Sequence, residues 1–164
     1  MAEVVQVEKQ LLIDPARCIG CRSCAGACYY GHLDTPALAY EEIEQSNAMP
    51  MVCRQCEDAP CVAACPRDAM YKDDAGIVRR SAVLCTGCLS CVLACPFGVL
   101  NREIVKRQVA KCDLCADRTR QSPPRMPRCV SVCPSGALKF MELEQEVVRA
   151  GYQLLSGRIV TPLR

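Results

Sequence analysis

Aromatic residues are scarce in this chain. Its 164 residues include no Trp, two Phe and five Tyr. Aromatic side chains normally supply a large share of the apolar area that a core buries. The length suits one domain or two very small ones. Other groups must therefore provide much of the bulk of the interior.

Long apolar runs and targeting signals are also missing. No run of about 18 apolar residues is present, so the sequence predicts no membrane span. The start, MAEVVQVEKQLL, lacks a basic region followed by an apolar run and a cleavage site, and no twin-arginine leader is present. The net charge of +2 gives no general argument for nucleic acid as a partner.

The residues of a catalytic site are absent as well. His32 is the only histidine, and the sequence contains no nucleophile–base arrangement and no glycine-rich phosphate loop. We therefore expect the chain not to be an enzyme, and we expect any substrate chemistry to belong to a partner.

Cysteine, by contrast, is abundant and regularly spaced. The third of four groups reads CTGCLSCVLACP, which is C-x2-C-x2-C-x3-C-P, the spacing that binds a cubane 4Fe-4S cluster. In proteins with two such clusters, the fourth cysteine of a group ligates the other cluster. Three groups end in Cys-Pro, whereas Cys28 is followed by Tyr29, where we expect the ligand to be kept and the turn to differ. The groups are Cys18, Cys21, Cys24, Cys28; Cys53, Cys56, Cys61, Cys65; Cys85, Cys88, Cys91, Cys95; and Cys112, Cys115, Cys129, Cys133.

Disulfides and zinc are the two other uses to which these cysteines could be put. A disulfide framework is typical of small secreted proteins, but no secretory signal is present, and cysteines two residues apart make poor disulfide partners. Zinc sites use two C-x2-C pairs and do not need the middle cysteines Cys24, Cys61 and Cys91. The fourth group alone, C-x2-C-x13-C-x3-C, is compatible with zinc. The pattern favours sixteen iron ligands and four 4Fe-4S clusters, and free thiolates on iron suit a reducing cytoplasm.

Four clusters would also replace the missing aromatic bulk. Each would act as a cross-link around which the chain folds, so we expect folding and metal binding to be coupled. The predicted fold class is a small, metal-organised α+β structure of short strands, hairpins and helical turns. It combines two ferredoxin-like units, each with two clusters.

A repeated order of cluster loop, Cys-Pro, helical turn and strand supports this organisation. Strands are expected in QLLIDPARCIGC, from Ala37 to Ile43, and in PSGALKFMEL. Residues 66–80 predict a hairpin with its turn at Asp73–Gly76, and residues 96–110 predict a strand at Val99 and Leu100 with a return through Ile104, Val105 and Val109.

Two segments have two interpretations each. The section from Arg102 to Arg128 is basic and contains a proline-rich loop, RTRQSPPRMPR, which is either a solvated surface loop or a docking loop for an acidic partner. From Met141 to Leu155, helical spacing places Leu143, Val147, Val148 and Leu154 on one face. That face would pack either against its own domain or on a partner.

Several stretches resemble a known family. MVCRQCEDAPCVAACP at 51–66, KCDLC at 111–115 and CYYGH at 28–32 resemble the four-cluster electron-transfer subunits of molybdenum- and tungsten-pterin oxidoreductases. The same ferredoxin family serves formate dehydrogenases, dimethyl sulfoxide reductases, some hydrogenases and carbon monoxide dehydrogenases. The resemblance covers about residues 10–140 and includes all sixteen cysteines.

The resemblance implies a crossed pairing of ligands. Residues 1–50 and 96–140 would form one ferredoxin-like unit, residues 51–95 the other, and residues 141–164 a helical tail. The four clusters would lie in a line. The implied ligand sets are Cys18, Cys21, Cys24 with Cys133; Cys112, Cys115, Cys129 with Cys28; Cys53, Cys56, Cys61 with Cys95; and Cys85, Cys88, Cys91 with Cys65.

Residues beside the ligands are candidates for adjusting reduction potentials. Gly20 and Gly87 lie inside cluster loops, where glycine lets backbone N–H groups approach sulfur. Cluster potentials respond to charge, hydrogen bonding and exposure. His32 is expected to pack near a cluster and not to ligate it, because the cysteine count is already complete. The flanking polar residues are Arg54, Gln55, Lys111 and Asp113.

These features predict an electron-transfer subunit that relays single electrons through four clusters. The expected partner is a catalytic subunit of the tungsten- or molybdenum-pterin type, such as an aldehyde oxidoreductase or formate dehydrogenase, with a flavin subunit or another acceptor and further copies of the chain as possible neighbours. A hydrogenase or carbon monoxide dehydrogenase partner and a free-standing polyferredoxin are the alternatives.

Overall fold

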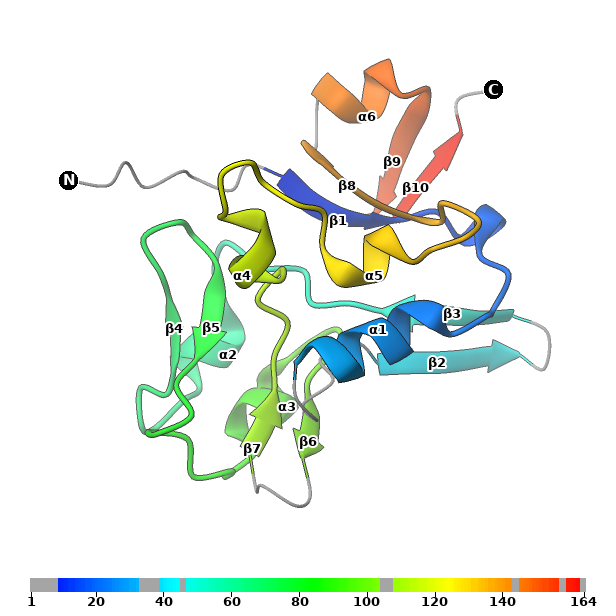
Figure 1. The fold of residues 1–164 in the computed structure, drawn as a ribbon. Coiled ribbons are helices and arrows are strands. Elements are labelled where there is room, and N and C mark those ends of the chain that lie inside the picture. The colour runs from blue at the N-terminus through cyan, green and yellow to red at the C-terminus, as the bar shows by residue number, and fades with distance from the viewer. Residues whose placement is uncertain are drawn as a thin grey trace.

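The computed structural model describes residues 9–32, 39–44, 47–103, 108–142, 145–156 and 159–162. Short helices and strands alternate along this part of the chain (Figure 1). Within these ranges, no helix is long and apolar enough to cross a bilayer.

The helices are α1 Ser23–Gly31, α2 Pro60–Ala63, α3 Ser90–Ala94, α4 Ala116–Thr119, α5 Arg128–Ser131 and α6 Gln145–Arg149, with a 3-10 turn at Pro15–Arg17. The strands are β1 Lys9–Ile13, β2 Ala39–Glu44, β3 Asn47–Met51, β4 Met70–Lys72, β5 Val78–Arg80, β6 Asn101–Glu103, β7 Gln108–Ala110, β8 Leu138–Glu142, β9 Tyr152–Ser156 and β10 Ile159–Pro162.

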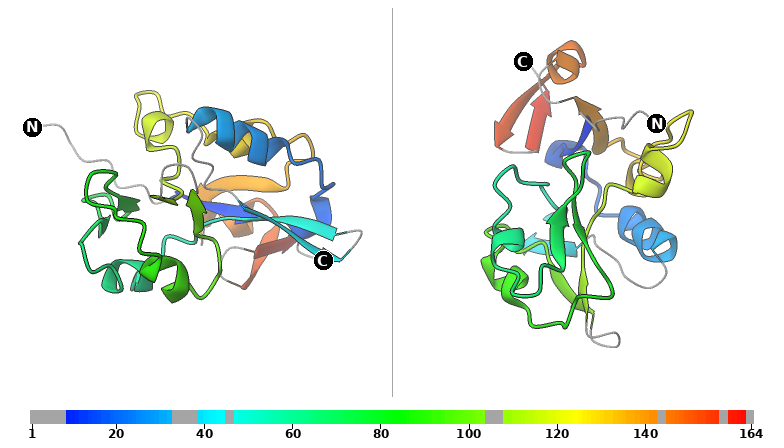
Figure 2. Two further views of the ribbon diagram at one scale, coloured as in Figure 1. Left: turned by 90° about the horizontal axis from the view of Figure 1, so that it is seen from below. Right: turned by 90° about the vertical axis from the view of Figure 1, so that its left-hand side faces the viewer.

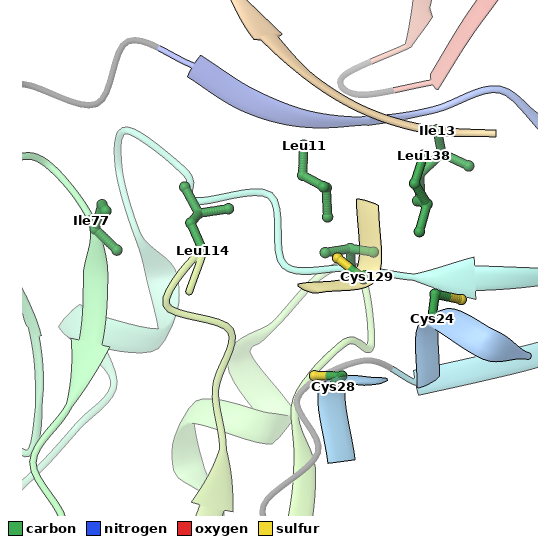
Figure 3. Close-up of a cluster of buried hydrophobic side chains, with 9 residues drawn as sticks. Leu11, Ile13, Cys24, Cys28, Ile77, Leu114, Cys129 and Leu138 are labelled. Atoms are coloured by element: carbon green, nitrogen blue, oxygen red, sulfur yellow. The ribbon is translucent and has the colours of Figure 1, made fainter. Parts of the chain in front are cut away.

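A four-stranded sheet in the order β8-β1-β10-β9 forms one end of the molecule. Its central strand β1 pairs antiparallel with β8, where Leu11 lies opposite Phe140, and parallel with β10. Three consecutive residues of β1 are buried, so both faces of this strand are covered. Leu11 and Ile13 face a core that includes Cys24, Cys28 and Cys129 (Figure 3). Leu12 packs with Val147, Tyr152 and Val160 on the other face.

The C-terminal segment corrects one prediction. A helical tail is expected from the sequence over residues 141–164, but among the described residues of this segment only Gln145–Arg149 is helical, and residues 152–156 and 159–162 are strands. Helical spacing is misleading here because β9 and β10 gain their hydrogen bonds from the sheet. Of the four residues predicted to share one face, Val147 is 2 % exposed, whereas Val148 is 63 % exposed and lies off that face. The side chains of Leu143 and Leu154 lie outside the described residues. Val147 packs on Leu12 of the domain's own strand β1.

The described residues also form three two-stranded sheets, and one of these, the β4–β5 hairpin, agrees fully with expectation. Strands β4 and β5 pair antiparallel around the turn at residues 73–76. The Asp73 carboxylate accepts hydrogen bonds from the backbone N–H groups of Ala75 and Ile77, at 3.2 and 3.0 Å, and Gly76 has φ +75°. This confirms the predicted hairpin and its turn.

The other two hairpins differ from expectation in their limits. Strand β6 begins at Asn101, and Val99 and Leu100, expected in the strand, precede it as buried loop residues. The expected return through Val109 is β7, whereas Ile104 and Val105 lie outside the described residues. Strand β2 covers Ala39 to Glu44, and residues 37–38 of the predicted strand also lie outside them.

Two pairs of helices hold at least one cysteine from each of the four groups. Helix α1 packs against α5, near the four-stranded sheet, and α2 packs against α3, near the β4–β5 hairpin (Figures 1 and 2). Segments distant in sequence therefore meet at each pair. The arrangement brings the first cysteine group to the fourth, and the second group to the third.

Candidate metal centres

Four hollows in the described part of the chain are each lined by four cysteines, and every cysteine of the chain lines one of them. Site 1 has Cys18, Cys21, Cys24 and Cys133; site 2 has Cys28, Cys112, Cys115 and Cys129; site 3 has Cys53, Cys56, Cys61 and Cys95; site 4 has Cys65, Cys85, Cys88 and Cys91. Their volumes are similar, at about 290, 370, 340 and 310 Å³ for sites 1 to 4, and part of each space is open to solvent.

These four sets are the ones that the family resemblance implies. Each hollow takes three cysteines from one group and the fourth from another. Helix α1 supplies Cys24 to site 1 and Cys28 to site 2. The α2 segment likewise supplies Cys61 to site 3, and Cys65 just beyond its end supplies site 4. Neighbouring sites therefore share a helical turn.

One backbone position recurs in all four loops. The residue before the second cysteine of each C-x2-C has positive φ: +68° at Gly20, +70° at Gly87, +49° at Gln55 and +58° at Leu114. Left-handed residues in a tight loop turn successive N–H groups into one concavity, which suits an anionic group. Glycine makes this position recognisable in two loops only. The sequence does not reveal Gln55 and Leu114 in this role, because their types give no signal for it.

A second recurring feature is the turn that follows three of the groups. The N–H groups of Asp68, Gly98 and Gly136 donate to the carbonyls of Cys65, Cys95 and Cys133 at 3.4, 3.3 and 3.3 Å. All three donors have positive φ. Proline at the second position and glycine at the fourth are typical of a type I turn. Cys95 is extended, as expected before proline.

The first group departs from this turn, as the sequence predicts. Helix α1 continues through Cys28 to Gly31, because Tyr29 retains the backbone N–H that proline lacks. The extra residues bring His32 to site 2, where its Nε2 lies 3.5 Å from Cys115 Sγ. His32 therefore packs beside a cysteine that lines the hollow, in agreement with the expectation for this residue.

Other polar groups contact the cysteine sulfurs. Lys111 Nζ lies 3.0 Å from Cys53 Sγ and donates to the carbonyl of Cys112 at 2.8 Å. The hydroxyls of Ser90 and Ser135 lie 3.5 and 3.7 Å from the sulfurs of Cys88 and Cys133. Sequence reasoning missed the two serines, although each stands two residues after the cysteine that it contacts.

The surroundings shift the thiol pKa values in both directions. Burial raises the pKa of Cys24 to about 11 and that of Cys112 to about 12, and it also raises the pKa of Cys129. The pKa of Cys115 is lowered overall. Burial by itself would raise it, but the hydrogen bond with His32 and other nearby groups together lower it by more. Buried thiols must lose their protons when a metal binds, so loading releases protons.

The hollows fit an iron–sulfur cluster better than a single ion. A zinc site places its sulfurs about 2.3 Å from one ion. Among the described residues, no three His, Cys, Asp or Glu side chains are gathered closely enough to hold one metal ion, although four cysteines line each hollow. In site 3, apolar side chains such as Val78, Phe97 and Leu100 complete the wall. Four thiols around an apolar hollow of this kind match the cysteine ligation of a 4Fe-4S cluster.

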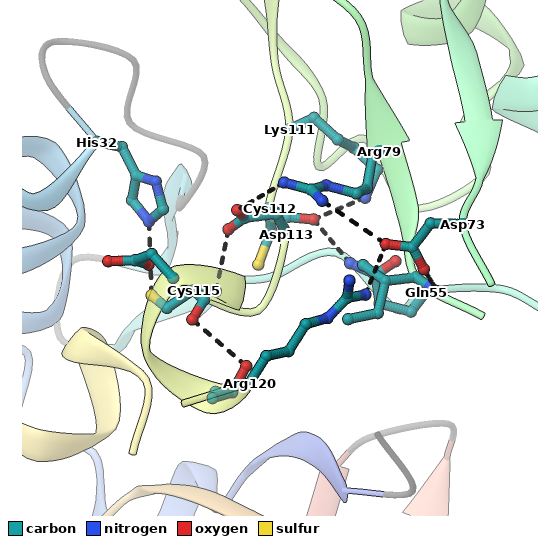
Figure 4. A network of polar contacts seen from close by, with 12 residues as sticks. His32, Gln55, Asp73, Arg79, Lys111, Cys112, Asp113, Cys115 and Arg120 are labelled. Carbon is teal, nitrogen blue, oxygen red and sulfur yellow. Dashed lines mark hydrogen bonds and ion pairs between the residues drawn. The ribbon is translucent and has the colours of Figure 1, made fainter. Parts of the chain in front are cut away.

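The predicted basic section is partly engaged within the molecule. Arg120 pairs with Asp73 at 2.6 Å, and Arg128 donates to Asp117 Oδ1 at 2.9 Å. Figure 4 shows the network from His32 and Cys115 to Asp73 and Arg120. Arg102, Lys106 and Arg107 have side chains outside the described residues. The loop at 121–126 is exposed, which agrees with both of its interpretations.

Site exposure differs along the molecule. Cys21 of site 1 and Cys88 of site 4 are exposed, whereas the cysteines of sites 2 and 3 are buried or half-buried. Exposed apolar residues lie beside the cysteines of these two sites: Ile19 at site 1 is 66 % exposed, and Val83 and Leu93 at site 4 are 93 % and 87 % exposed. Sites 1 and 4 are thus the ones closest to solvent.

Comparison with known proteins gives the same chemistry. Residues 45–143 match a 4Fe-4S dicluster domain, and residues 11–31 match a 4Fe-4S binding domain. The chain is 37 % identical to the thiosulfate reductase electron transfer subunit PhsB of Salmonella typhi, over 85 % of this chain and 78 % of that protein. It is 32 % identical to a subunit of the polysulfide reductase of Wolinella succinogenes, over 93 % of this chain and 85 % of that subunit. It is 34 % identical to the electron transport protein HydN of Escherichia coli K12, over 78 % of this chain and 85 % of that protein.

Proposed function

Because this chain belongs to the family of 4Fe-4S dicluster ferredoxin proteins, we propose that it is the non-catalytic subunit that relays single electrons through four 4Fe-4S clusters in an oxidoreductase complex. The observation that carries the proposal is the set of four similar hollows, each with four cysteines. The sixteen cysteines are the number that four such clusters require.

The sixteen ligands are assigned as sites 1 to 4, in that order along a line. The shared helical turns support the order. Cys24 and Cys28 lie four residues apart on α1, a rise of about 6 Å along a helix, and they belong to sites 1 and 2. Cys91 on α3 and Cys95, which directly follows that helix, belong to sites 4 and 3. Sites 1 and 2 would form one ferredoxin-like unit, and sites 3 and 4 the other.

The residues of the chain bind and insulate the clusters. Cysteine sulfurs would hold them, the left-handed loops would present backbone N–H groups to them, and apolar side chains such as Val78 and Leu100 would line part of site 3. When bound, the clusters supply one-electron oxidation and reduction without bond making. The exposed edges at Cys21 and Cys88 make sites 1 and 4 the points of entry and exit.

The partner is proposed to be a catalytic subunit with a molybdenum- or tungsten-pterin centre. The names of the relatives, thiosulfate reductase and polysulfide reductase, support a reductase complex and add sulfur-compound reductases to the candidates. Aldehyde oxidoreductase and formate dehydrogenase stay proposals of the same kind, as do a flavin subunit or a further copy of the chain as electron acceptor. The cytoplasm is the proposed compartment, because its reducing conditions keep unligated thiols free.

Anaerobic analysis of iron, sulfide and zinc in the chain purified from its native host tests the cofactor content. Four clusters require about sixteen irons and sixteen sulfides. A result of about twelve irons with one zinc would reassign the fourth cysteine group. Zinc without iron would refute the electron-transfer proposal.

Identification of co-purifying proteins tests the complex. A pterin-containing subunit that stays bound at high salt is the expected result. A chain that carries four clusters but purifies alone at low and high salt would instead be a free-standing polyferredoxin. A nickel-containing partner would assign it to a hydrogenase or carbon monoxide dehydrogenase.

A further inference from the structure

Lys111 lies between sites 2 and 3, the two inner sites of the proposed line. Its side chain lines the hollow of site 3, and its Nζ lies 3.0 Å from Cys53 Sγ of that site. The same ammonium donates at 2.8 Å to the backbone carbonyl of Cys112, which belongs to site 2. One positive charge thus contacts cysteine residues of both sites.

Gln55, an uncharged residue, contacts the same two cysteines as Lys111. Its backbone N–H donates to Cys53 Sγ at 3.5 Å, and its side-chain Nε2 donates to the carbonyl of Cys112 at 2.7 Å. The backbone N–H of Val78 donates to Gln55 Oε1 at 2.9 Å, which holds the amide in this orientation. Gln55, Lys111 and Cys112 lie together beside the β4–β5 hairpin (Figure 4). The position of Lys111 is therefore part of an ordered hydrogen-bonded bridge.

A positive charge at this place favours negative charge in both sites. The Lys111 ammonium contacts a sulfur of site 3 directly and reaches site 2 through the backbone carbonyl of Cys112. A cluster becomes more negative by one charge when it accepts an electron. Within a partly dry interior, a nearby ammonium stabilises that added charge more than it would in water.

We propose that Lys111 sets the reduction potentials of the two inner clusters together, raising both and that of site 3 more strongly. This inference rests on the proposed function. In the transfer between these sites, one cluster is oxidised by one electron and the other is reduced by one. Because the same positive charge lies near both clusters, it stabilises the electron whether the electron is on the cluster of site 2 or on that of site 3.

The test is a redox titration, followed by electron paramagnetic resonance, of the full chain purified anaerobically with its clusters. In Lys111→Met, two of the four midpoint potentials should fall. The larger shift should correspond to about tenfold in the equilibrium constant for reduction, or about 59 mV for a one-electron couple. Lys111→Arg keeps the charge and should restore most of both shifts.

Lys72→Met is the matched control. The ammonium of Lys72 is exposed and donates to the carbonyl of Glu57 at 2.8 Å, so this variant loses the same charge and the same type of bond to a carbonyl. Lys72 lines none of the four cysteine hollows of the described residues. All four potentials should therefore stay near those of the parent. Equal shifts in Lys72→Met and Lys111→Met would refute the proposal, because they would reflect net charge alone.

Two further outcomes are decisive. Unmoved potentials in a fully loaded Lys111→Met protein would overturn the role of Lys111 and leave the electron-transfer proposal intact, whereas a parent protein without iron would overturn the electron-transfer proposal itself. If Lys111→Met loads incompletely, Lys111→Gln is titrated instead, since it keeps a donor without the charge. Potentials equal to the parent's in that loaded variant would also refute the role of the charge.

Discussion

At the scale of single residues, contacts around the cysteines distinguish positions that look alike in sequence. Gly26 and Gly31 both lie in α1, yet a Cβ at Gly26 would meet no atom within 4 Å, whereas a Cβ at Gly31 would overlap Cδ and Nε of Arg128. Arg128 is held by the carboxylate of Asp117, and this hydrogen bond lowers the pKa of Asp117. Gly31 therefore leaves space for an ordered guanidinium beside site 2.

Alanine at these two glycines should have opposite effects. Gly26→Ala should raise the free energy of unfolding by about 0.5–1 kcal/mol, because glycine is a poor helix former. Gly31→Ala should lose that gain and weaken the half-exposed Arg128–Asp117 pair, which is worth about 0.2–1 kcal/mol. The apparent thermal midpoints of the loaded proteins, compared at one heating rate, measure the difference. An equal rise in both variants would contradict the close packing of Arg128 on Gly31.

At the scale of elements, the Cys-Pro turns are short but demanding. Gly98 and Gly136 have φ of +60° and +64°, and no atom lies within 4 Å of a Cβ built at either. Any cost of a side chain there would come from the backbone conformation alone. Asp68, at φ +49°, takes the same place after Cys65.

Substitutions in this turn measure how much a left-handed backbone conformation costs in stability. Gly98→Ala should lower stability by about 1 kcal/mol, because left-handed φ costs an L-residue roughly that amount. Gly98→Asn should cost less, since Asn tolerates this conformation better. Asp68→Gly should be neutral or stabilising. Apparent thermal midpoints check the series, and an Ala variant as stable as the Asn variant would show that φ at residue 98 does not limit stability.

Helix α6 gives a second test at this scale. Val147 is buried against Leu12, Tyr152 and Val160, while its neighbour Val148 is exposed. Val147→Ala removes two buried carbon atoms and should cost about 1.5–2 kcal/mol, at about 0.8 kcal/mol for each. Val148→Ala should change stability by less than about 0.5 kcal/mol. Similar losses in both variants, measured as apparent thermal midpoints, would mean that α6 does not pack on β1 as described.

At the scale of the whole molecule, crossed ligation ties distant segments together. Cys65 follows α2 but lines site 4, and Cys95 follows α3 but lines site 3. Site 2 joins Cys28 to residues 112–129 in the same manner. Each proposed cluster would therefore hold together two parts of the chain that are far apart in sequence, which a core poor in aromatics needs.

Replacement of Cys65 or Cys95, each of which lines the site formed mainly by the other's group, tests this arrangement. Cys95→Ala should damage the cluster of Cys53, Cys56 and Cys61, and Cys65→Ala should damage the cluster of Cys85, Cys88 and Cys91. Iron content and the paramagnetic resonance signals of each variant identify the cluster that is lost. If Cys95→Ala instead removed the same signal as Cys85→Ala, ligation within each group would replace the crossed assignment.

Much of this protein followed from its sequence, because cysteine spacing and turn residues are local signals. The chemistry, the β4–β5 hairpin, strands β1 and β8, and the altered turn after Cys28 could all be predicted. Cluster loops depend on a few consecutive dihedral angles, and in two of the four loops glycine, at residues 20 and 87, indicates the left-handed position. The crossed sets of cysteines came from the family resemblance, and the spacing alone left them open.

Tertiary structure alone decided the features that depend on distant partners. Residues 152–162 have helical spacing in part, yet those that the structure describes are strands, because β10 pairs with β1 and β9 pairs with β10. Gln55 and Leu114 take left-handed conformations that their residue types do not announce. Lys111 stands next to Cys112 in sequence, but its contact with Cys53, 58 residues away, exists only because the chain folds back between sites 2 and 3. Long-range pairing sets these positions, and no local pattern records it.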